Sequence, residues 1–234
     1  ALLVMRLNLP FLVALLLAGV IAAVLATLVT LPIWRLGGHY VSMATLALGY
    51  IVLSVIRGWD AVTKGAYGLS GIPAPEILGL RLLVAEDHYQ LDLVVLAVTL
   101  FVVFRIRSSH LGNVLAAVGS DEIASLSLGL RTRGYKALAY ALAAFFAGMA
   151  GALLAHQYNY LDPTVFTVQM SVLVLTIVVL GGINSPFGAV LGSLALVGLP
   201  EALRLAPDVR ILLYGIVVIA IIRFLPQGLW TRSA

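Results

Sequence analysis

The chain has 234 residues, of which 62% are hydrophobic and only 10% are charged, and its formal net charge is +4 at pH 7. Soluble domains carry about 25% charged residues, so this composition excludes a water-soluble globular protein and favours one whose solvent is lipid. The small positive charge does not indicate nucleic-acid binding, because basic residues at the inner face of a membrane protein give the same balance. Since the chain has no cysteine, disulfides and thiolate chemistry are also excluded.

Apolar segments recur along the whole chain. A transmembrane helix needs about 20 mostly apolar residues, and the segments that approach this length are 9–31, 38–57, 90–106, 135–157, 167–182, 186–203 and 210–226. The sequence therefore predicts an all-α, polytopic transmembrane helical bundle of about seven spans, which forms a single domain over residues 1–234.

The orientation of these spans follows from the basic residues. Arg105, Arg107, Arg131, Arg133 and Lys136 flank one short polar segment, and an excess of Lys and Arg marks the cytoplasmic side of a membrane. We therefore expect an external loop at about 58–90 and a cytoplasmic segment at about 107–134.

The cytoplasmic segment is predicted to contain a short capped helix. Ser120 is a suitable N-cap, and Asp121 and Glu122 fall in the first turn, where the helix dipole favours acids. Gly129 suits the left-handed position just beyond the helix end.

Such a short helix is not stable alone in water, so it must dock on something. Ile123 and Leu126 are three residues apart and share a face. The helix is either an amphipathic connector that lies on lipid, or a coupling helix seated in a groove of a cytoplasmic protein. The candidates for contact with that protein are Ser120, Asp121, Glu122, Ile123, Leu126, Gly129 and Arg131.

Glycines interrupt the later spans. The pair at 181–182 either breaks a helix or lets two backbones touch, and Ser185 followed by Pro186 is typical of a helix start. This block is either a tight turn or a hinge between two spans, and Gly148 and Gly151 indicate close helix packing. The candidates for hinge or packing roles are Gly148, Gly151, Gly181, Gly182, Ser185, Pro186 and Gly188.

Several short sequence blocks resemble those of a known family and follow one another in the same order. They are residues 40–46 with Gly49, 68–73, 116–124, 128–130, 135–136, 147–153, 179–192 (VLGGINSPFGAVLG), 214–215 and 226–229. Together they resemble the permeases of branched-chain amino acid ABC transporters, of the LivM-type subunit. The chain departs from the family pattern at Tyr50, where the family has Glu, and at Gly119, where it has Arg. It also lacks the family's further N-terminal spans, so it is either cut short or a shortened homologue.

The resemblance implies a multi-pass permease subunit in the bacterial inner membrane that imports branched-chain amino acids by alternating access. Its partners would be a second, homologous permease subunit, two cytoplasmic ATP-binding subunits and an external substrate-binding protein. No Gly-x-x-x-x-Gly-Lys-Ser/Thr loop is present to cradle a triphosphate, so ATP and Mg would be bound by the partner subunits and no cofactor by this chain. The sequence offers neither a metal-ligand cluster nor a nucleophile–base pair, so we predict no metal site, no catalytic residue and no enzyme activity.

The zwitterion of an amino acid needs polar partners along a translocation path. The candidates are Ser42, Thr45, Tyr50, Ser54 and Thr176. Any of the hydroxyls could instead bond to the backbone of its own helix, which is their commoner role in membranes.

The long external loop is expected to carry function. It either docks the substrate-binding protein, through Gly68, Gly71, Ile72 and Pro73, or packs on the bundle as a plug.

Other classes of protein remain open at this point. An ion-coupled secondary transporter would need ionisable groups or unwound helices at the midplane, and these spans carry almost no central charge. A membrane scaffold would leave the capped helix and the glycine block unexplained. Relatives of the family also suggest urea or short amides as alternative substrates.

Overall fold

The long apolar segments of the chain form helices. The computed structural model describes residues 1–30, 39–77, 80–81, 85–182 and 185–198. The chain forms two compact units, Ala1–Val165 and Phe166–Ala234. The predicted span at 210–226 lies outside the described residues.

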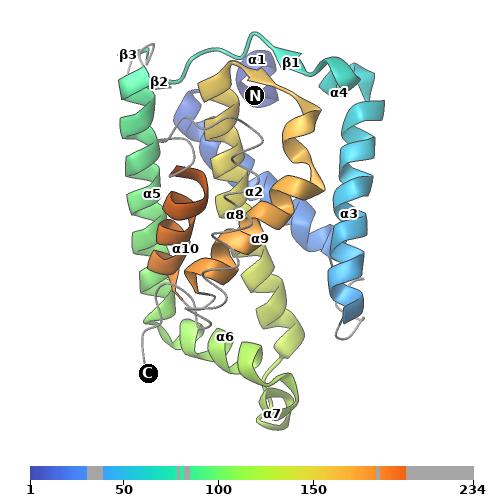
Figure 1. Cartoon of the computed structure of the whole chain (residues 1–234), viewed down its shortest axis with the longest axis vertical. Coiled ribbons are helices and arrows are strands. Elements are labelled where there is room, and N and C mark those ends of the chain that lie inside the picture. Colours follow the sequence, from blue (N-terminus) through green and yellow to red (C-terminus); the bar gives the residue numbers. More distant parts are fainter. Residues whose placement is uncertain (31–38, 78–79, 82–84, 183–184, 199–234) are drawn as a thin grey trace. The chain divides into compact units, whose positions relative to one another are not determined.

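The first unit is built from helices joined by short turns (Figure 1). The helices are α1 (Leu2–Leu7), α2 (Phe11–Thr30), α3 (His39–Gly58), α4 (Asp60–Thr63), the 3-10 helix η2 (Gly65–Tyr67), α5 (Ala85–Arg107), α6 (His110–Ser120), α7 (Glu122–Ser127), α8 (Thr132–Tyr158) and the 3-10 helix η3 (Pro163–Phe166), whose last residue begins the second unit.

The core of the first unit lies where α2 packs against α8. Phe11, Leu15, Met149 and Ala152 form a buried apolar cluster there. The helices approach closely because small residues line the contact: a Cβ added at Gly148 would lie 2.6 Å from Ala22 Cβ. Small residues that let backbones approach are typical of helix packing in membranes.

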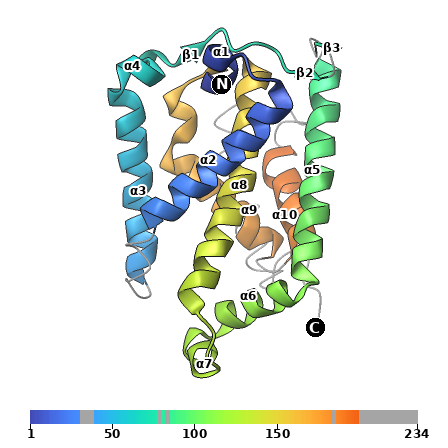
Figure 2. The same cartoon turned by 180° about the vertical axis from the view of Figure 1, so that it is seen from behind.

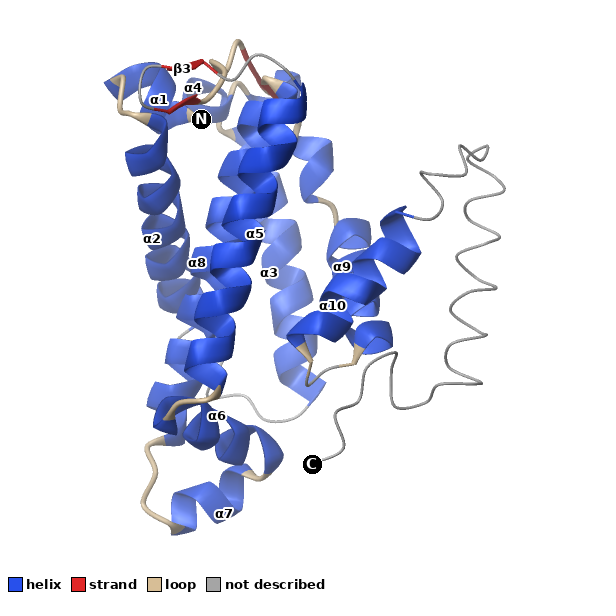
Figure 3. Ribbon diagram, turned by 90° about the vertical axis from the view of Figure 1, so that its left-hand side faces the viewer, coloured by secondary structure: helices blue, strands red, loops and turns tan. Residues whose placement is uncertain are grey.

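Two short antiparallel pairs of strands lie at one end of the first unit (Figure 3). Strand β1 (Leu69–Ser70) pairs with β4 (Tyr160–Leu161), and β2 (Glu76–Ile77) pairs with β3 (Leu80–Arg81). The first pair attaches the predicted external loop to the residues that follow α8. A hydrogen bond from the Tyr160 hydroxyl to the Tyr67 carbonyl, at 3.0 Å, adds to this attachment.

The cytoplasmic segment of the prediction lies at the other end of the same unit. Helix α5 runs from the strands to α6 and α7, and α8 returns toward the strands (Figures 1 and 2). The predicted external loop and the predicted short helix are therefore at opposite ends of the first unit.

The second unit contains α9 (Val168–Gly181), α10 (Pro186–Ser193) and a π-helical turn η4 (Leu194–Gly198). The segments Val168–Gly181 and Pro186–Gly198 are bent by 120° relative to each other. With 14 residues, α9 is only about 21 Å long, too short for a hydrocarbon core of about 30 Å.

By length and composition, the described residues contain 3 helices that could cross a membrane, or up to 5 if each bent pair is one span. The three are Phe11–Thr30, Glu86–Arg107 and Thr132–Tyr158, and the bent pairs are Met43–Gly58 with Asp60–Tyr67 and Val168–Gly181 with Pro186–Gly198. The two spans predicted at 167–182 and 186–203 thus count together as one bent candidate, because the glycine pair turns the chain before either segment reaches full length.

Candidate functional site

The short helix of the polar segment is present as α7, but its N-cap is not Ser120. Ser120 ends α6, and its hydroxyl donates to the Ala117 carbonyl at 2.9 Å. Asp121 has the extended backbone of an N-cap (φ −148°), and its carboxylate accepts from the Ile123 and Ala124 amides at 2.9 and 3.0 Å. The Ser120 prediction was wrong because α6 includes Ser120 as its last residue, so the extended backbone that an N-cap needs falls at Asp121.

The end of α7 agrees with the prediction for Gly129. Its φ is +80°, in the left-handed region. The Gly129 amide donates to the Leu126 carbonyl at 2.9 Å, and the Leu130 amide donates to the Ser125 carbonyl at 3.1 Å. This pair of bonds is the Schellman motif, which satisfies carbonyls that the helix end leaves unpaired.

Glu122 joins α7 to the start of α8. Its carboxylate accepts a 2.5 Å hydrogen bond from Lys136 Nζ and a 3.3 Å bond from the hydroxyl of Thr132, which is buried. The bond from Lys136 holds the pKa of Glu122 below its ordinary value, with smaller support from Thr132 and Arg133. Glu122 was predicted as a contact with a partner, but its carboxylate is engaged within the chain.

The outward side of α7 is apolar. Ile123 is 78% exposed, Leu126 is 54% exposed and Leu128 is 80% exposed, whereas Ser125 on the same helix is buried. We call Ile123, Leu126 and Leu128 the α7 apolar surface. The sequence predicted the first two, and it missed Leu128 because that residue lies past the last helical turn. Arg131, the N-cap residue of α8, is exposed beside it.

The predicted docking loop lies packed at the strand end of the first unit. Ile72 is buried, with 3% exposed, and its amide donates to the Asn159 carbonyl at 3.3 Å. Gly68 is buried with φ +69°, and a Cβ there would overlap the Leu161 carbonyl oxygen. Gly71 and Pro73 are exposed, so these two, and not Ile72, could meet another protein.

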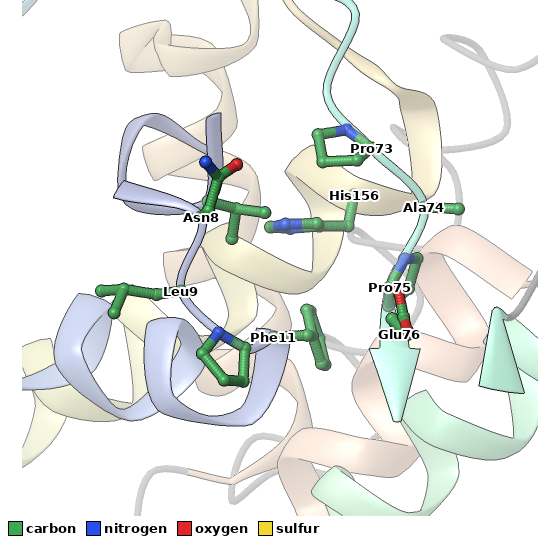
Figure 4. Close-up of a pocket in the computed structure, with 10 residues that line it drawn as sticks. Asn8, Leu9, Phe11, Pro73, Ala74, Pro75, Glu76 and His156 are labelled. Atoms are coloured by element: carbon green, nitrogen blue, oxygen red, sulfur yellow. The ribbon is translucent and has the colours of Figure 1, made fainter. Parts of the chain in front are cut away.

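A pocket of about 550 Å³ lies beside this loop. Its lining comes from residues 4 and 8–11 around the α1–α2 turn, from residues 73–76, and from His156 of α8. Figure 4 shows the imidazole extending from α8 between these two segments. We call it the His156 pocket. It could not be predicted from the sequence, because a single histidine near a span end carries no spacing signal.

The candidates for the translocation path lie in α3 and α9. The side chains of Tyr50 and Ser54 on α3 are exposed, and Thr45 is half-buried. The Thr176 hydroxyl donates to the Val172 carbonyl of its own helix at 2.8 Å, which is the alternative role foreseen for such hydroxyls. Ser42 lies in α3, and its side chain is outside the described set.

The glycines predicted for packing or hinge roles divide into two groups. Gly148 is in close contact with α2, whereas a Cβ at Gly151 would meet nothing within 4 Å. In the second unit, a Cβ at Gly181 would overlap the Gly188 carbonyl oxygen, so α9 and α10 touch through their backbones.

The start of α10 has the predicted cap. The Ser185 hydroxyl accepts from the Gly188 amide at 3.1 Å, and Pro186 is the first helical residue. Gly182 ends α9 with φ +110°, a backbone conformation that favours glycine.

Among the described parts of the chain, no group of three or more His, Asp or Glu side chains could hold a metal ion.

Comparisons with known proteins identify what the chain is similar to. Residues 1–222 match the family described as "Branched-chain amino acid transport system / permease component". No solved structure matches the chain.

Three relatives illustrate the similarity. One relative is the permease protein LivM of the high-affinity branched-chain amino acid transport system of Escherichia coli K12. It is 33% identical over an alignment of 235 residues, which covers 91% of this chain and 55% of the relative. LivM of Salmonella typhimurium is 32% identical over 236 residues, or 91% of this chain and 56% of the relative. LivH of Escherichia coli K12 is 34% identical over 145 residues, which cover 60% of this chain and 44% of the relative. The chain spans about half the length of the curated relatives it matches.

Proposed function

The chain belongs to the family of branched-chain amino acid transport permease components, and from this premise we propose that it is the membrane-spanning subunit of an ATP-driven ABC importer. The resemblance seen in the sequence blocks is thereby confirmed. The family consists of non-catalytic transport subunits, so the chain is not an enzyme. Under the proposal, ATP and Mg are bound and ATP is hydrolysed by separate subunits.

The observation that carries this proposal is the α7 apolar surface. Three large apolar side chains are exposed on α7 and its C-cap residue, and basic residues flank this segment. Lys and Arg mark the cytoplasmic side. An apolar ridge on a capped helix suits insertion into a groove of a soluble protein. We therefore assign α7 as the coupling helix that an ATP-binding subunit engages.

The contact between Glu122 and Lys136 supports a route for the coupled movement. Because Glu122 joins α7 to α8, a displacement of α7 would pull on the start of α8. Helix α8 packs along α2 through the cluster of Phe11 and Met149. Movement at the cytoplasmic end would thus reach two candidate spans together.

The remaining assignments rest on the family and on these placements. We propose a single polytopic permease domain in the bacterial inner membrane, with alternating access for branched-chain or related hydrophobic amino acids. The proposed partners are a second, homologous permease subunit, two ATP-binding subunits and an external substrate-binding protein. Within this chain, Tyr50 and Ser54 would line the translocation path, and Gly71 and Pro73 would contact the binding protein. The Gly181–Gly182 bend would act as a hinge.

Co-purification tests the importer proposal. The full-length permease that contains this chain would be expressed with its transport partners, as wild type and with Ile123→Asp and Leu126→Asp together. We expect the ATPase subunits to be recovered with the wild type and lost with the double variant. Tyr67→Asp is the matched control, because Tyr67 is 87% exposed at the opposite end of the first unit, and it should keep the ATPase subunits.

The other outcomes decide between the remaining classes. If neither protein recovers an ATPase and uptake follows an ion gradient, the chain is a secondary transporter. If the double variant keeps the ATPase subunits but binds lipid less well, α7 is an interfacial connector and the coupling assignment is wrong.

A further inference from the structure

The chain turns sharply where α3 ends. Helix α3 has 20 residues and is therefore about 30 Å long, which equals the thickness of the hydrocarbon core, about 30 Å. With α3 as a membrane span, its last residue, Gly58, falls at the membrane boundary. The segment Asp60–Tyr67, which holds α4 and η2, is bent by 73° relative to Met43–Gly58, so it runs nearly along the membrane surface (Figure 1). We call residues 57–64 the α3–α4 corner.

Short hydrogen bonds fix the shape of this corner. The Thr63 hydroxyl lies 2.6 Å from the Ile56 carbonyl oxygen in the last turn of α3, a group that a helix end leaves unpaired. The Gly65 amide donates to the same hydroxyl at 3.3 Å. Gly65 has φ +59°, and a Cβ there would overlap the Asp60 carboxylate. The corner is therefore a defined structure that holds its side chains in place.

Three basic residues from different segments lie around α4. Arg57 is in the last turn of α3, and Lys64 ends α4 with φ +56°. Their backbones are close, because a Cβ at Gly65 would lie 3.0 Å from the Arg57 carbonyl oxygen. Arg6 comes from α1, and its Nη2 donates to the Ala61 carbonyl of α4 at 3.3 Å. All three basic residues are exposed.

The corner combines this positive charge with an exposed indole. Trp59 lies between the end of α3 and the start of α4 and is 54% exposed. Asp60 is the one acid in the sequence 57–64, so the three basic residues leave an excess of positive charge. Tryptophan is enriched at the headgroup level of membranes, and Lys and Arg extend their charged ends into the same layer. An indole among cations at the membrane boundary suits a lipid headgroup that carries negative charge.

From this arrangement we propose that the α3–α4 corner, together with Arg6, binds the phosphate of an anionic phospholipid. The side chains of Arg6, Arg57 and Lys64 donate to the phosphate oxygens, and the Trp59 indole lies among the headgroups. Each basic side chain near an anionic surface contributes about a fivefold preference. A zwitterionic lipid carries the same phosphate with a cation beside it and therefore binds more weakly.

The lipid site depends on α3 as a membrane span and not on the proposed importer function. In the orientation expected from the basic residues, the corner lies in the external leaflet. A permease that recovers no ATPase subunit would still keep this site. An importer whose corner binds no lipid would still be an importer, so the two proposals fail separately.

Photo-crosslinking in nanodiscs tests the site. The full-length permease that contains this chain would be placed in phosphatidylcholine with a small share of phosphatidylglycerol that carries a diazirine on its headgroup. Light should label residue 6 and residues 57–64, and the matching diazirine phosphatidylcholine should label them at least about fivefold less. Equal labelling by the two lipids would overturn the charge assignment, and labelling confined to other segments would remove the corner as the site.

Variants test the basic residues. Arg57→Gln with Lys64→Gln should lower the labelling of the corner by phosphatidylglycerol about tenfold. Arg105→Gln with Arg133→Gln is the matched control, because it removes the same charge from two exposed residues at the opposite end of the first unit. This control should leave the labelling of the corner unchanged. An equal loss in both double variants would show that the net charge of the chain, and not the corner, attracts the lipid.

Two further measurements separate the lipid from other occupants. Excess inorganic phosphate should not displace the crosslinking lipid from the wild type, and displacement would assign the corner to a soluble anion instead. Lipids brominated near the headgroup should quench the fluorescence of Trp59 more than lipids brominated near the chain end, taken as the difference between wild type and Trp59→Phe. A Trp59 that neither lipid quenches would lie away from the membrane and would overturn the proposal.

Discussion

Lys136 Nζ lies 2.5 Å from the Glu122 carboxylate and so joins the first turn of α7 to the second turn of α8. Thr132 holds the other oxygen of the same carboxylate at 3.3 Å. Both charged side chains are more than a third exposed, and exposed ion pairs add little to overall stability. Their effect is therefore on where α7 sits, which is the property that a coupling helix requires.

The first prediction separates position from stability. Lys136→Met should leave the free energy of unfolding within about 1 kcal/mol of the wild type, yet it should lower the amount of substrate moved per ATP hydrolysed in the reconstituted transporter. The exchange of charges in Glu122→Lys with Lys136→Glu should recover part of that ratio. Arg133→Met is the control, because Arg133 is an exposed neighbour whose charge has a smaller effect on the pKa of Glu122 than the bond from Lys136 has. An unchanged ratio in Lys136→Met would show that the contact plays no part in coupling.

The second prediction concerns pH. The hydrogen bond from Lys136 lowers the pKa of Glu122 below the ordinary value of 4.5 in the folded chain. A carboxyl with a depressed pKa stabilises the fold above its unfolded pKa and loses that contribution as pH falls through its folded pKa. The contact of α7 with α8 should thus be insensitive to pH from 8 down to about 5 and should weaken only in acid.

Hydrogen exchange or spin-label distances between α7 and α8 would measure this contact. Glu122→Gln carries no titrating group and should show no acid-dependent step at α7. A step near neutral pH in the wild type would mean that another group controls the contact.

The third prediction follows from the cap of α7. Asp121→Ala removes the acceptor for two backbone amides and should destabilise α7 by about 1 kcal/mol, the usual value of an N-cap. Ser120→Ala removes only a bond to the Ala117 carbonyl within α6 and should change α7 much less. Faster hydrogen exchange in α7 for Asp121→Ala alone is the expected result. Equal effects of the two substitutions would contradict the cap assignment.

The sequence predicted the long helices α2, α3, α5 and α8 correctly because a run of about 20 apolar residues has few other stable solutions in lipid. It also predicted Gly129 at the end of α7, since a left-handed backbone position favours glycine. It misplaced the N-cap, because Ser120 and Asp121 are adjacent and both can cap. Only the extent of α6, which depends on packing, decides between them.

The contacts between distant residues could not be read from the sequence. The β1–β4 pair joins two-residue strands about ninety positions apart, and such short strands carry no alternation pattern. Glu122 and Lys136 are separated by 14 residues and a Schellman turn, so helical spacing does not relate them. Among the described residues His156 Nε2 has no hydrogen-bond partner, which is visible only once Ala152 and Phe11 are placed around the ring.

The last prediction uses two glycines on one helix. A Cβ at Gly148 would lie 2.6 Å from Ala22 Cβ and 2.7 Å from the Ala18 carbonyl oxygen, whereas a Cβ at Gly151 would meet nothing within 4 Å. Gly148→Ala should therefore force α2 and α8 apart at a cost of about 1–3 kcal/mol, as overpacking does. Gly151→Ala should be neutral or stabilise α8 by up to about 1 kcal/mol through its better helix propensity. The measurement is the thermal unfolding midpoint of the purified permease, with uptake as a second readout. If both alanines lower the midpoint equally, the effect belongs to α8 itself and the close approach of α2 is not what requires glycine at 148.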